Sequence, residues 1–165
     1  MTLLPSDLKQ YVRYDPETGI FTSARDSGCK GQWKAGRRIG HVNKKGYLTI
    51  WIEPRGYFAH RVAWALMTGE WPQEELDHAN GIRDDNRWCN LREASHAQNM
   101  ANTRRSKANK SGYKGVHRFD DNLWRASVRF NGKRYDVGLF RCPTAAFFAR
   151  NAKAKELHGE FARSA

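Results

Sequence analysis

Cysteines are few, acidic side chains are outnumbered and long apolar runs are absent in this chain of 165 residues. The three cysteines, Cys29, Cys89 and Cys142, form no CxxC pair, which argues against a zinc knuckle and a disulfide framework. No apolar run approaches the roughly 20 residues that a membrane-spanning helix needs. The first residues also lack the basic and apolar segments of a signal peptide. These absences predict a cytoplasmic protein with free thiols and no membrane partner.

Positive charge is in excess, and the excess is concentrated in one part of the chain. Lys and Arg number 29 against 17 Asp and Glu, which gives a formal net charge of +12. Residues 104–165 hold 15 basic and 5 acidic side chains, so only +2 remains for residues 1–103. A field of this sign favours a polyanionic partner. Nucleic acid is the first candidate, because neutralised phosphates release condensed counterions.

The first part of the chain has the turn and alternation patterns of an α+β protein. Residues 1–58 are predicted to form a β-rich module, in which "YDPETGIFTS" is a turn that opens into a strand. The runs "GYLTIWI" and "GYFAHR" predict a hairpin around Pro54-Arg55-Gly56. Residues 30–46 are basic and glycine-rich and are expected to form an exposed loop. Residues 60–69 have apolar residues at helical spacing and end in Gly69, which predicts a short amphipathic helix.

The last part of the chain predicts three strands and a helix behind a linker. Residues 105–112 are basic, small and without apolar periodicity, which is typical of a linker. The strands are expected in "YKGVHRF", "LWRASVRF" and "KRYDVGLF", with Asn131-Gly132 as a strong hairpin signal between the last two. The helix is expected to have Thr144 as N-cap and Gly159 just past its end. The apolar stripe expected to face the sheet consists of Ala145, Phe148, Ala149, Ala152 and Leu157.

Alternation along "LWRASVRF" separates two faces of the predicted sheet. The apolar face, expected under the helix, consists of Trp124, Ala126, Val128 and Phe130. The opposite face has Arg125, Ser127 and Arg129, joined in similar register by His117, Arg134 and Asp136. A cationic sheet surface of this size can enter the major groove of DNA. A merely solvated charged face is the alternative.

The stretch "LDHANGIRDDNRWCNLREASHAQNMAN", residues 76–102, gathers many oxygen and nitrogen ligands. Asp77 and His78 are neighbours, so on an extended segment their side chains point to opposite faces. Ser95 and Gln98 form a capping box, so a helix should begin there, with Asn99 in its first turns. A carboxylate and an amide oxygen, with water, make a hard-oxygen site of the kind that Mg²⁺ prefers. A histidine beside such a site can take a proton from water.

This stretch resembles the HNH, or ββα-metal, endonucleases, most closely those of the phage and intron-homing type. The resemblance covers about residues 57–103 and rests on Asp77-His78, on Asn90 twelve residues after His78 and on Asn99 nine further on. It implies that Asp77 and Asn99 hold the metal, that His78 is the general base and that Asn90 braces the loop. The motif ends in Asn where the eponymous pattern has His, which is a variant of the phage branch.

Three further residues near the motif have open roles. His96 lies one turn before Asn99 and is a candidate ligand or substrate contact, with a solvent-facing helix residue as the alternative. Arg92 is the best of the nearby arginines for clamping a phosphate, although a surface role is the alternative. His60 is expected to pack or to form hydrogen bonds at the start of its helix.

Residues 113–162 resemble the plant ethylene-response-factor type of DNA-binding domain, through "YKGVHR", "LWRASVR", "VGLF", "TAAFFAR" and "HGEFA" in order. That family reads DNA with its three-stranded sheet. The resemblance therefore implies DNA contacts from His117, Arg118, Arg125, Ser127, Arg129 and Arg134. The sequence departs from that family at two points. The first strand has only His117-Arg118 where the family is arginine-rich, and position 127 is Ser where Glu is usual. The family's preference for GCC-type DNA sites is therefore not expected here.

Together these patterns predict a modular endonuclease. The expected parts are a β-rich module (1–58), an HNH core (59–104), a basic linker (105–112) and an ethylene-response-factor-like domain (113–165). The implied reaction is hydrolysis of phosphodiester bonds in double-stranded DNA. It is expected to need Mg²⁺ or another divalent cation such as Mn²⁺ and no small-molecule cofactor. If a phage encodes the chain, the expected location is the cytoplasm of the host cell. The alternative is a DNA-binding regulator that retains an inactive nuclease core. An RNA-binding module is less favoured, because no aromatic pair lies on the cationic face to stack bases.

Overall fold

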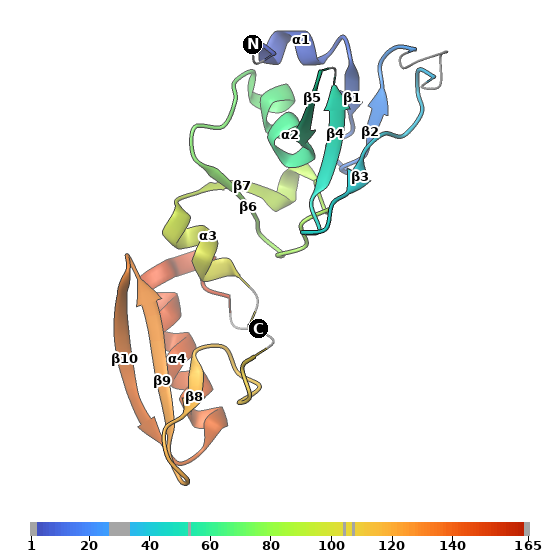
Figure 1. Ribbon diagram of the computed structural model, residues 1–165. Coiled ribbons are helices and arrows are strands. Elements are labelled where there is room, and N and C mark those ends of the chain that lie inside the picture. Colours follow the sequence, from blue (N-terminus) through green and yellow to red (C-terminus); the bar gives the residue numbers. More distant parts are fainter. Residues whose placement is uncertain (1–2, 27–33, 53, 104, 107, 164–165) are drawn as a thin grey trace. The chain divides into compact units, whose positions relative to one another are not determined.

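The computed structural model describes residues 3–26, 34–52, 54–103, 105–106 and 108–163. The chain forms two compact units, Met1–Glu93 and Ala94–Ala165. Both contain small antiparallel sheets and helices, so the predicted α+β class is confirmed (Figure 1). Within the described ranges no helix is long and apolar enough to cross a bilayer. Cys29 and residues 30–33 of the expected exposed loop lie outside the described residues.

The first unit begins with two small antiparallel sheets. After helix α1 (Pro5–Leu8), strand β1 (Val12–Tyr14) pairs with β2 (Phe21–Ser23). Strands β3 (His41–Val42), β4 (Leu48–Ile52) and β5 (Arg55–Phe58) form the second sheet in that order. Because β4 pairs with β5 from Ile52↔Arg55 to Thr49↔Phe58, the hairpin predicted around Pro54 is confirmed.

Helix α2 (Ala59–Thr68) contributes much of the core of this unit. It ends at Gly69, whose φ of +83° is a left-handed conformation that glycine adopts without strain. Val62 and Ala63 of the predicted apolar face are buried, whereas Met67 is 44% exposed. The helix lies against α1, β4 and β5. The buried apolar side chains of this core are Leu8, Val12, Phe21, Ile50, Ile52, Ala59, Val62, Ala63, Ala65 and Leu91.

The motif region follows α2 as a pair of short strands and a helix. Strand β6 (Glu75–His78) pairs with β7 (Leu91–Ala94), and the intervening loop contains a short 3-10 helix, η2 (Trp88–Asn90). Helix α3 (His96–Asn102) comes next and belongs to the second unit. The predicted capping box is present, with Gln98 N donating to Ser95 Oγ and Ser95 N donating to Gln98 Oε1.

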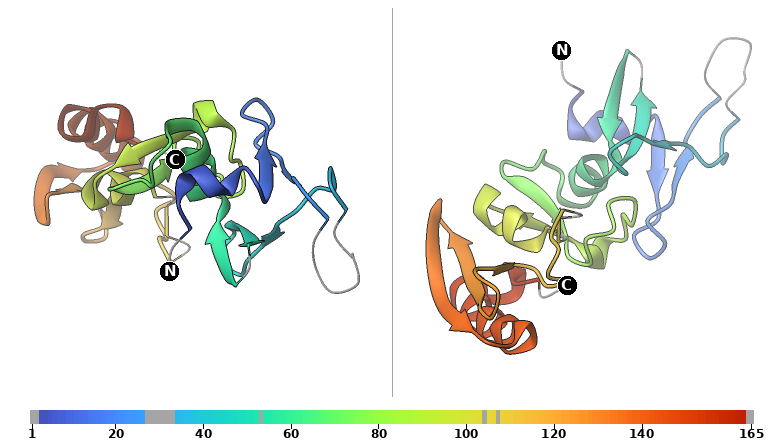
Figure 2. Two further views of the ribbon diagram at one scale, coloured as in Figure 1. Left: turned by 90° about the horizontal axis from the view of Figure 1, so that it is seen from above. Right: turned by 60° about the horizontal axis from the view of Figure 1, so that its bottom comes forward.

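The second unit contains the predicted three-stranded antiparallel sheet. Strands β8 (Val116–Arg118), β9 (Trp124–Phe130) and β10 (Lys133–Phe140) are arranged in the order β10-β9-β8. Asn131 and Gly132 both have positive φ, +47° and +75°, as the tight hairpin turn requires. Helix α4 (Pro143–His158), drawn in red, lies along one face of this sheet and is followed by η3 (Gly159–Phe161) (Figure 2).

Two details predicted for α4 are wrong. Cys142, not Thr144, occupies the N-cap position, because Pro143 begins the helix. The expected apolar stripe does not face the sheet, since Phe148 is 66% exposed. The buried residues of the helix are Ala146, Arg150, Ala154 and His158. Arg150 and His158 are buried because they bond the carbonyl oxygens of Arg163 and Arg129, so apolar periodicity alone could not identify this face.

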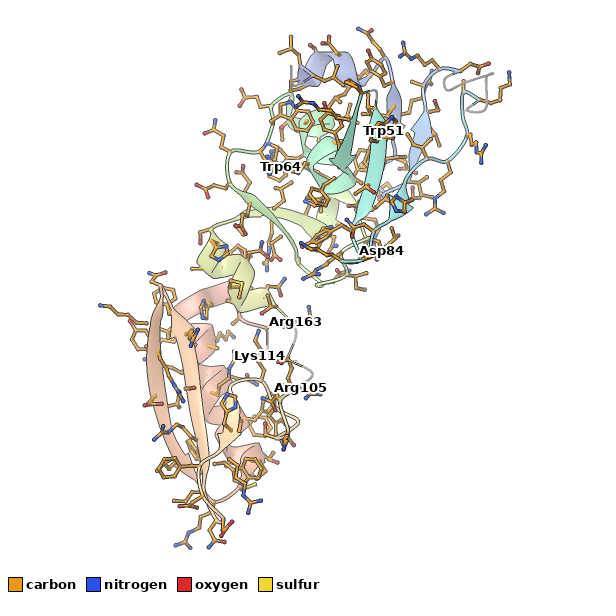
Figure 3. All side chains as sticks on the ribbon, viewed as in Figure 1. Trp51, Trp64, Asp84, Arg105, Lys114 and Arg163 are labelled. Carbon is orange, nitrogen blue, oxygen red and sulfur yellow. The ribbon has the colours of Figure 1, made fainter. Side chains whose placement is uncertain are left out.

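The basic segment expected as a linker is folded against the second unit where it is described. Asn109 Nδ2 donates to Tyr113 O at 2.9 Å, and Ser111 Oγ donates to Val116 O at 2.7 Å. The ammonium of Lys114, labelled in Figure 3, donates to Ala101 O and Thr103 O at the end of α3. These bonds tie α3 to the same unit as the sheet β8–β10.

Candidate active site and nucleic-acid interface

Strand β6 carries Asp77 and His78 into the interior of the first unit. Asp77 and His78 are each only 4% exposed, and Leu76, which precedes them, is also buried. Consecutive residues of a strand face opposite ways, and the two side chains accordingly have different partners. Asp77 contacts the neighbouring strand β7, whereas His78 contacts the loop between the strands and helix α2.

Asp77 forms a buried ion pair with Arg92 of β7. The Nε and Nη2 groups of Arg92 both donate to Asp77 Oδ2, at 3.0 and 2.9 Å. The Asp77 side chain is 5% exposed and that of Arg92 is 21% exposed. Charge-assisted hydrogen bonds of this kind are stronger than neutral ones, so Arg92 compensates a carboxylate that burial alone would make costly.

His78 lies in a cluster of rings at the start of α2. Its ring centroid is 5.1 Å from that of His60 and 6.0 Å from that of Tyr47, and Phe58 stacks on His60. Burial lowers the pKa of His78, although the Asn86 amide and the charge of Asp77 oppose this. The imidazole is therefore neutral near pH 7 and able to accept a proton.

His60 packs against the candidate base, in keeping with the packing role expected for it. It is 8% exposed, and burial together with the charges of His78 and Arg61 lowers its pKa to about 3. Its Nδ1 has no hydrogen-bond partner among the residues that the structure describes.

Asn90 links both ends of the loop that follows β6. Its Oδ1 accepts from Asn80 N at 2.9 Å, and its Nδ2 donates to Asp85 O at 2.7 Å. The backbone also closes at this residue, because Ala79 N donates to Asn90 O at 2.9 Å. A side chain that bonds two separate points of a loop in this way restricts the loop to one conformation.

Asn99 and His96 both lie on α3, in the second unit. His96 is the first residue of the helix and is exposed, and Asn99 follows in the first turn. The assignment of Asn99 as a metal ligand rests on its interval from His78 and Asn90 in the sequence.

The sheet β8–β10 presents polar side chains on the face opposite α4. Ala126 and Val128 are buried under the helix, so the alternating residues of β9 face away from it. The strand register places His117 beside Arg125, Arg134 beside Arg129 and Asp136 beside Ser127. This face is cationic overall, with Asp136 bonding Arg134 at 3.5 Å.

Arg118 and Arg125 are partly engaged within the unit. Arg118 pairs with Trp124 in register and bonds the carbonyl oxygens of Asp120 and Asp121 in the hairpin turn. The guanidinium of Arg125 lies 4.5 Å from the centroid of the Phe119 ring. A cavity of about 740 Å³ lies next to β8 and is lined by residues from Thr103 to Trp124. Four cationic side chains are among them: Arg105, Lys110, Lys114 and Arg118.

Asn86 contacts His78 but is not marked by the sequence patterns. It is 1% exposed, and its Oδ1 lies 3.4 Å from His78 Nε2. The run "DDNRW" in which it stands reads as one more turn among many Asn and Asp residues. Only its complete burial distinguishes it from the neighbouring turn residues.

Comparison with known proteins finds a family match over the motif region. Residues 57–101 match the family described as HNH endonuclease. The chain is 31% identical over 126 residues to protein 3.8 of Escherichia phage T7, which covers 73% of this chain and 98% of that protein. It is 33% identical over 105 residues to an uncharacterized HNH endonuclease of Acanthamoeba polyphaga mimivirus, covering 62% of this chain and 54% of that protein. The chain thus spans about half the length of that mimivirus relative. No solved structure matches the present chain.

The HNH endonuclease match spans the β6–β7 pair and includes the buried Asp77 and His78. The chain belongs to the same family as protein 3.8 of Escherichia phage T7, and its residues 57–101 match the HNH endonuclease family.

Proposed function

We propose that this protein is a divalent-metal-dependent DNA endonuclease that hydrolyses phosphodiester bonds with His78 as general base. The observation that supports this best is the β6–β7 pair, where a neutral, buried imidazole stands beside a buried carboxylate in a braced loop. In the proposed reaction water attacks the phosphorus and gives a proton to His78. The bond from phosphorus to the 3′ oxygen breaks and that oxygen takes a proton from solvent water, which leaves a 5′-phosphate and a 3′-hydroxyl.

The carboxylate of Asp77 and the amide oxygen of Asn99 are donor atoms of the kind that suits Mg²⁺ or Mn²⁺. Among the described residues no three His, Cys, Asp or Glu side chains are grouped to hold an ion. Mg²⁺ does not need such a group, because it binds through one or two carboxylates and keeps waters and substrate phosphates. Asp77 and Asn99 would hold the ion, which when bound stabilises charge on the scissile phosphate and the leaving oxygen.

Arg92 has a place in this proposal beside Asp77. Its guanidinium donates two hydrogen bonds to Asp77 Oδ2 and so holds the carboxylate in place in the interior. A guanidinium at this position also suits a phosphate, since its planar donors match phosphate oxygens. His96, exposed at the start of α3, is proposed as an auxiliary substrate contact only.

We further propose that the cationic face of β8–β10 binds double-stranded DNA in the manner of an ethylene-response-factor domain. The alternation of β9 and the net charge of the C-terminal part support this. The proposed contacts on this face are His117, Arg125, Ser127, Arg129 and Arg134. Arg118, in register with Trp124, lies on the other side of the strand and is proposed only as a phosphate contact at the edge of the sheet. Binding through phosphates gives affinity, and side chains that reach base edges in the major groove give selectivity.

The rival function is a DNA-binding regulator with an inactive nuclease core. The ion pair between Asp77 and Arg92 favours this regulator, because a carboxylate that is bonded to arginine is less available to a metal ion. Incubation of the full chain with double-stranded phage DNA and Mg²⁺ or Mn²⁺, followed by mapping of the ends, decides between them. We expect cuts with 5′-phosphate and 3′-hydroxyl ends. Specific binding without cleavage in either metal would support the regulator.

A further inference from the structure

The N-terminal β1–β2 hairpin and the loop after β6 meet at the backbone of one residue, Asn86, whose side chain is buried. Asn86 is the one polar residue among the largest fully buried side chains of the described part of the chain. A buried amide must have its hydrogen bonds satisfied or it is costly. Its two side-chain bonds go to Asp84 O and to the ring of His78.

The orientation of the Asn86 amide is determined by these two neighbours. Nδ2 donates to Asp84 O at 3.0 Å, so Oδ1 is the atom that faces His78 Nε2. The reverse orientation would set the amide oxygen against the carbonyl oxygen of Asp84, two acceptors without a hydrogen between them. His78 Nε2 therefore carries the hydrogen, and the lone pair of the neutral ring is on Nδ1.

The N-terminal hairpin holds the backbone of Asn86 in place. Tyr14 OH, at the end of β1, donates to Asn86 O at 2.7 Å, and Trp88 N donates to Pro16 O at 2.9 Å. Gly19 approaches so closely that a Cβ there would lie 2.6 Å from Arg87 N and 2.7 Å from Asn86 C. Its φ of +71° also favours glycine.

We infer that Asn86 is the positioning residue of His78 and that the β1–β2 hairpin serves to hold Asn86 against it. This inference rests on the proposed function, in which His78 is the general base. Asn86 fixes which ring nitrogen accepts the proton from water, and the ring contacts of His60 and Tyr47 support the imidazole from the side. The role of the N-terminal module is then to shape the active site rather than to bind DNA.

The first test is independent of cleavage. Nitrogen-15 NMR of the histidine side chains in the full chain at pH 7.5 reports the tautomer of each ring, and His78→Ala assigns the His78 signals. We expect wild-type His78 as the tautomer with hydrogen on Nε2. A wild-type ring with hydrogen on Nδ1 overturns the inference before any other variant is made.

The second test compares two asparagines of the same loop. Asn86→Leu removes the bond to His78, whereas Asn80→Leu removes side-chain bonds to Asp85 and Ile82 within the same loop. We expect Asn86→Leu to mix the two tautomers of His78 and to lower kcat about 10–100-fold at unchanged KM, as loss of an orienting partner does. Asn80→Leu should leave the tautomer unchanged. Equal effects of the two substitutions on the tautomer would reduce Asn86 to a loop residue and overturn the inference.

Tyr14→Phe is the milder variant if Asn86→Leu does not fold. It removes only the hydroxyl that donates to Asn86 O and keeps the ring. We expect a partial loss of the tautomer preference and a smaller fall in kcat, and an unchanged His78 spectrum would contradict the role given to the hairpin. If the wild type cuts no DNA, the proposed function fails, while the NMR result still decides whether Asn86 sets the tautomer.

Discussion

The polar side chains proposed for function are buried in the first compact unit and exposed in the second. In the first unit, His60, Asp77, His78, Asn86 and Asn90 are all buried, at 8% exposure or less. In the second unit, Arg129 and Arg134 are exposed on the open face of a sheet. Residues 94–165 have the same net charge of +10 as residues 104–165, because residues 94–103 carry no Lys, Arg, Asp or Glu. The first unit is therefore left with +2.

This difference follows from what each kind of site requires. A proton-transfer site needs side chains held in one geometry and away from water, so its polar groups are buried and bonded to one another. A surface that attracts a polyanion acts through a field and through side chains that remain accessible, so its charges stay outside. The predictions below test whether chemistry belongs to the first unit and affinity to the second.

The largest effect on cleavage is expected from substitution of Asp77. Asp77→Ala should abolish cleavage, and EDTA should silence the wild-type protein, because the carboxylate is the proposed metal ligand. Asp77→Asn, which keeps the shape beside Arg92, should fail as well, and its melting temperature controls for stability. Cleavage that persists undiminished in EDTA would rule out a metal-dependent mechanism.

His78→Ala should reduce the cleavage rate about 10²–10⁴-fold, the usual contribution of a general base. DNA affinity should stay near that of wild type, since the sheet of the second unit is untouched. His96→Ala is the matched control and should lose activity only in part. A His78→Ala protein that cleaves at the wild-type rate would remove the base from the proposal.

Replacing Arg125, Arg129 and Arg134 by Gln should lower DNA affinity rather than kcat. The slope of log affinity against log salt should become shallower by about 0.9 for each phosphate that the variant no longer neutralises. Lys153→Gln with Lys155→Gln, on helix α4, is the control within the same unit. If the control weakens binding as much as the sheet variant, the sheet is not the DNA-binding face.

The smallest effect concerns acid stability of the first unit. The pKa of His60 falls from 6.5 to about 3 in the folded protein. Between these values the unfolded chain binds more protons, so stability is lost as pH falls through this window. Lowering the pH from 7 to 5 should reduce the free energy of unfolding by about 2 kcal/mol through this group. Urea titrations of wild type and His60→Phe, followed by tryptophan fluorescence, measure it, and equal pH dependence in both would contradict the prediction.

Local sequence patterns were sufficient for most of the elements. The Asn131-Gly132 turn, the Ser95-Gln98 capping box and the closing Gly69 were all predictable, because each depends on backbone preferences within a few residues. The concentration of charge in the C-terminal part was equally plain. The Asp77-His78 pair and Asn90 could also be predicted as candidate site residues, since their order and intervals are present in the sequence itself, and their roles remain predictions.

The tertiary structure alone decided which side chains meet. Asp77 joins Arg92 across 15 residues, and Tyr14 reaches the Asn86 backbone across 72 residues. Lys114 ties α3 to the unit that contains the sheet, and α4 buries Arg150 and His158 instead of Phe148. Periodicity could not identify these partners, because a buried polar side chain is placed by hydrogen bonds to groups that are distant in the sequence and not by its sequence neighbours.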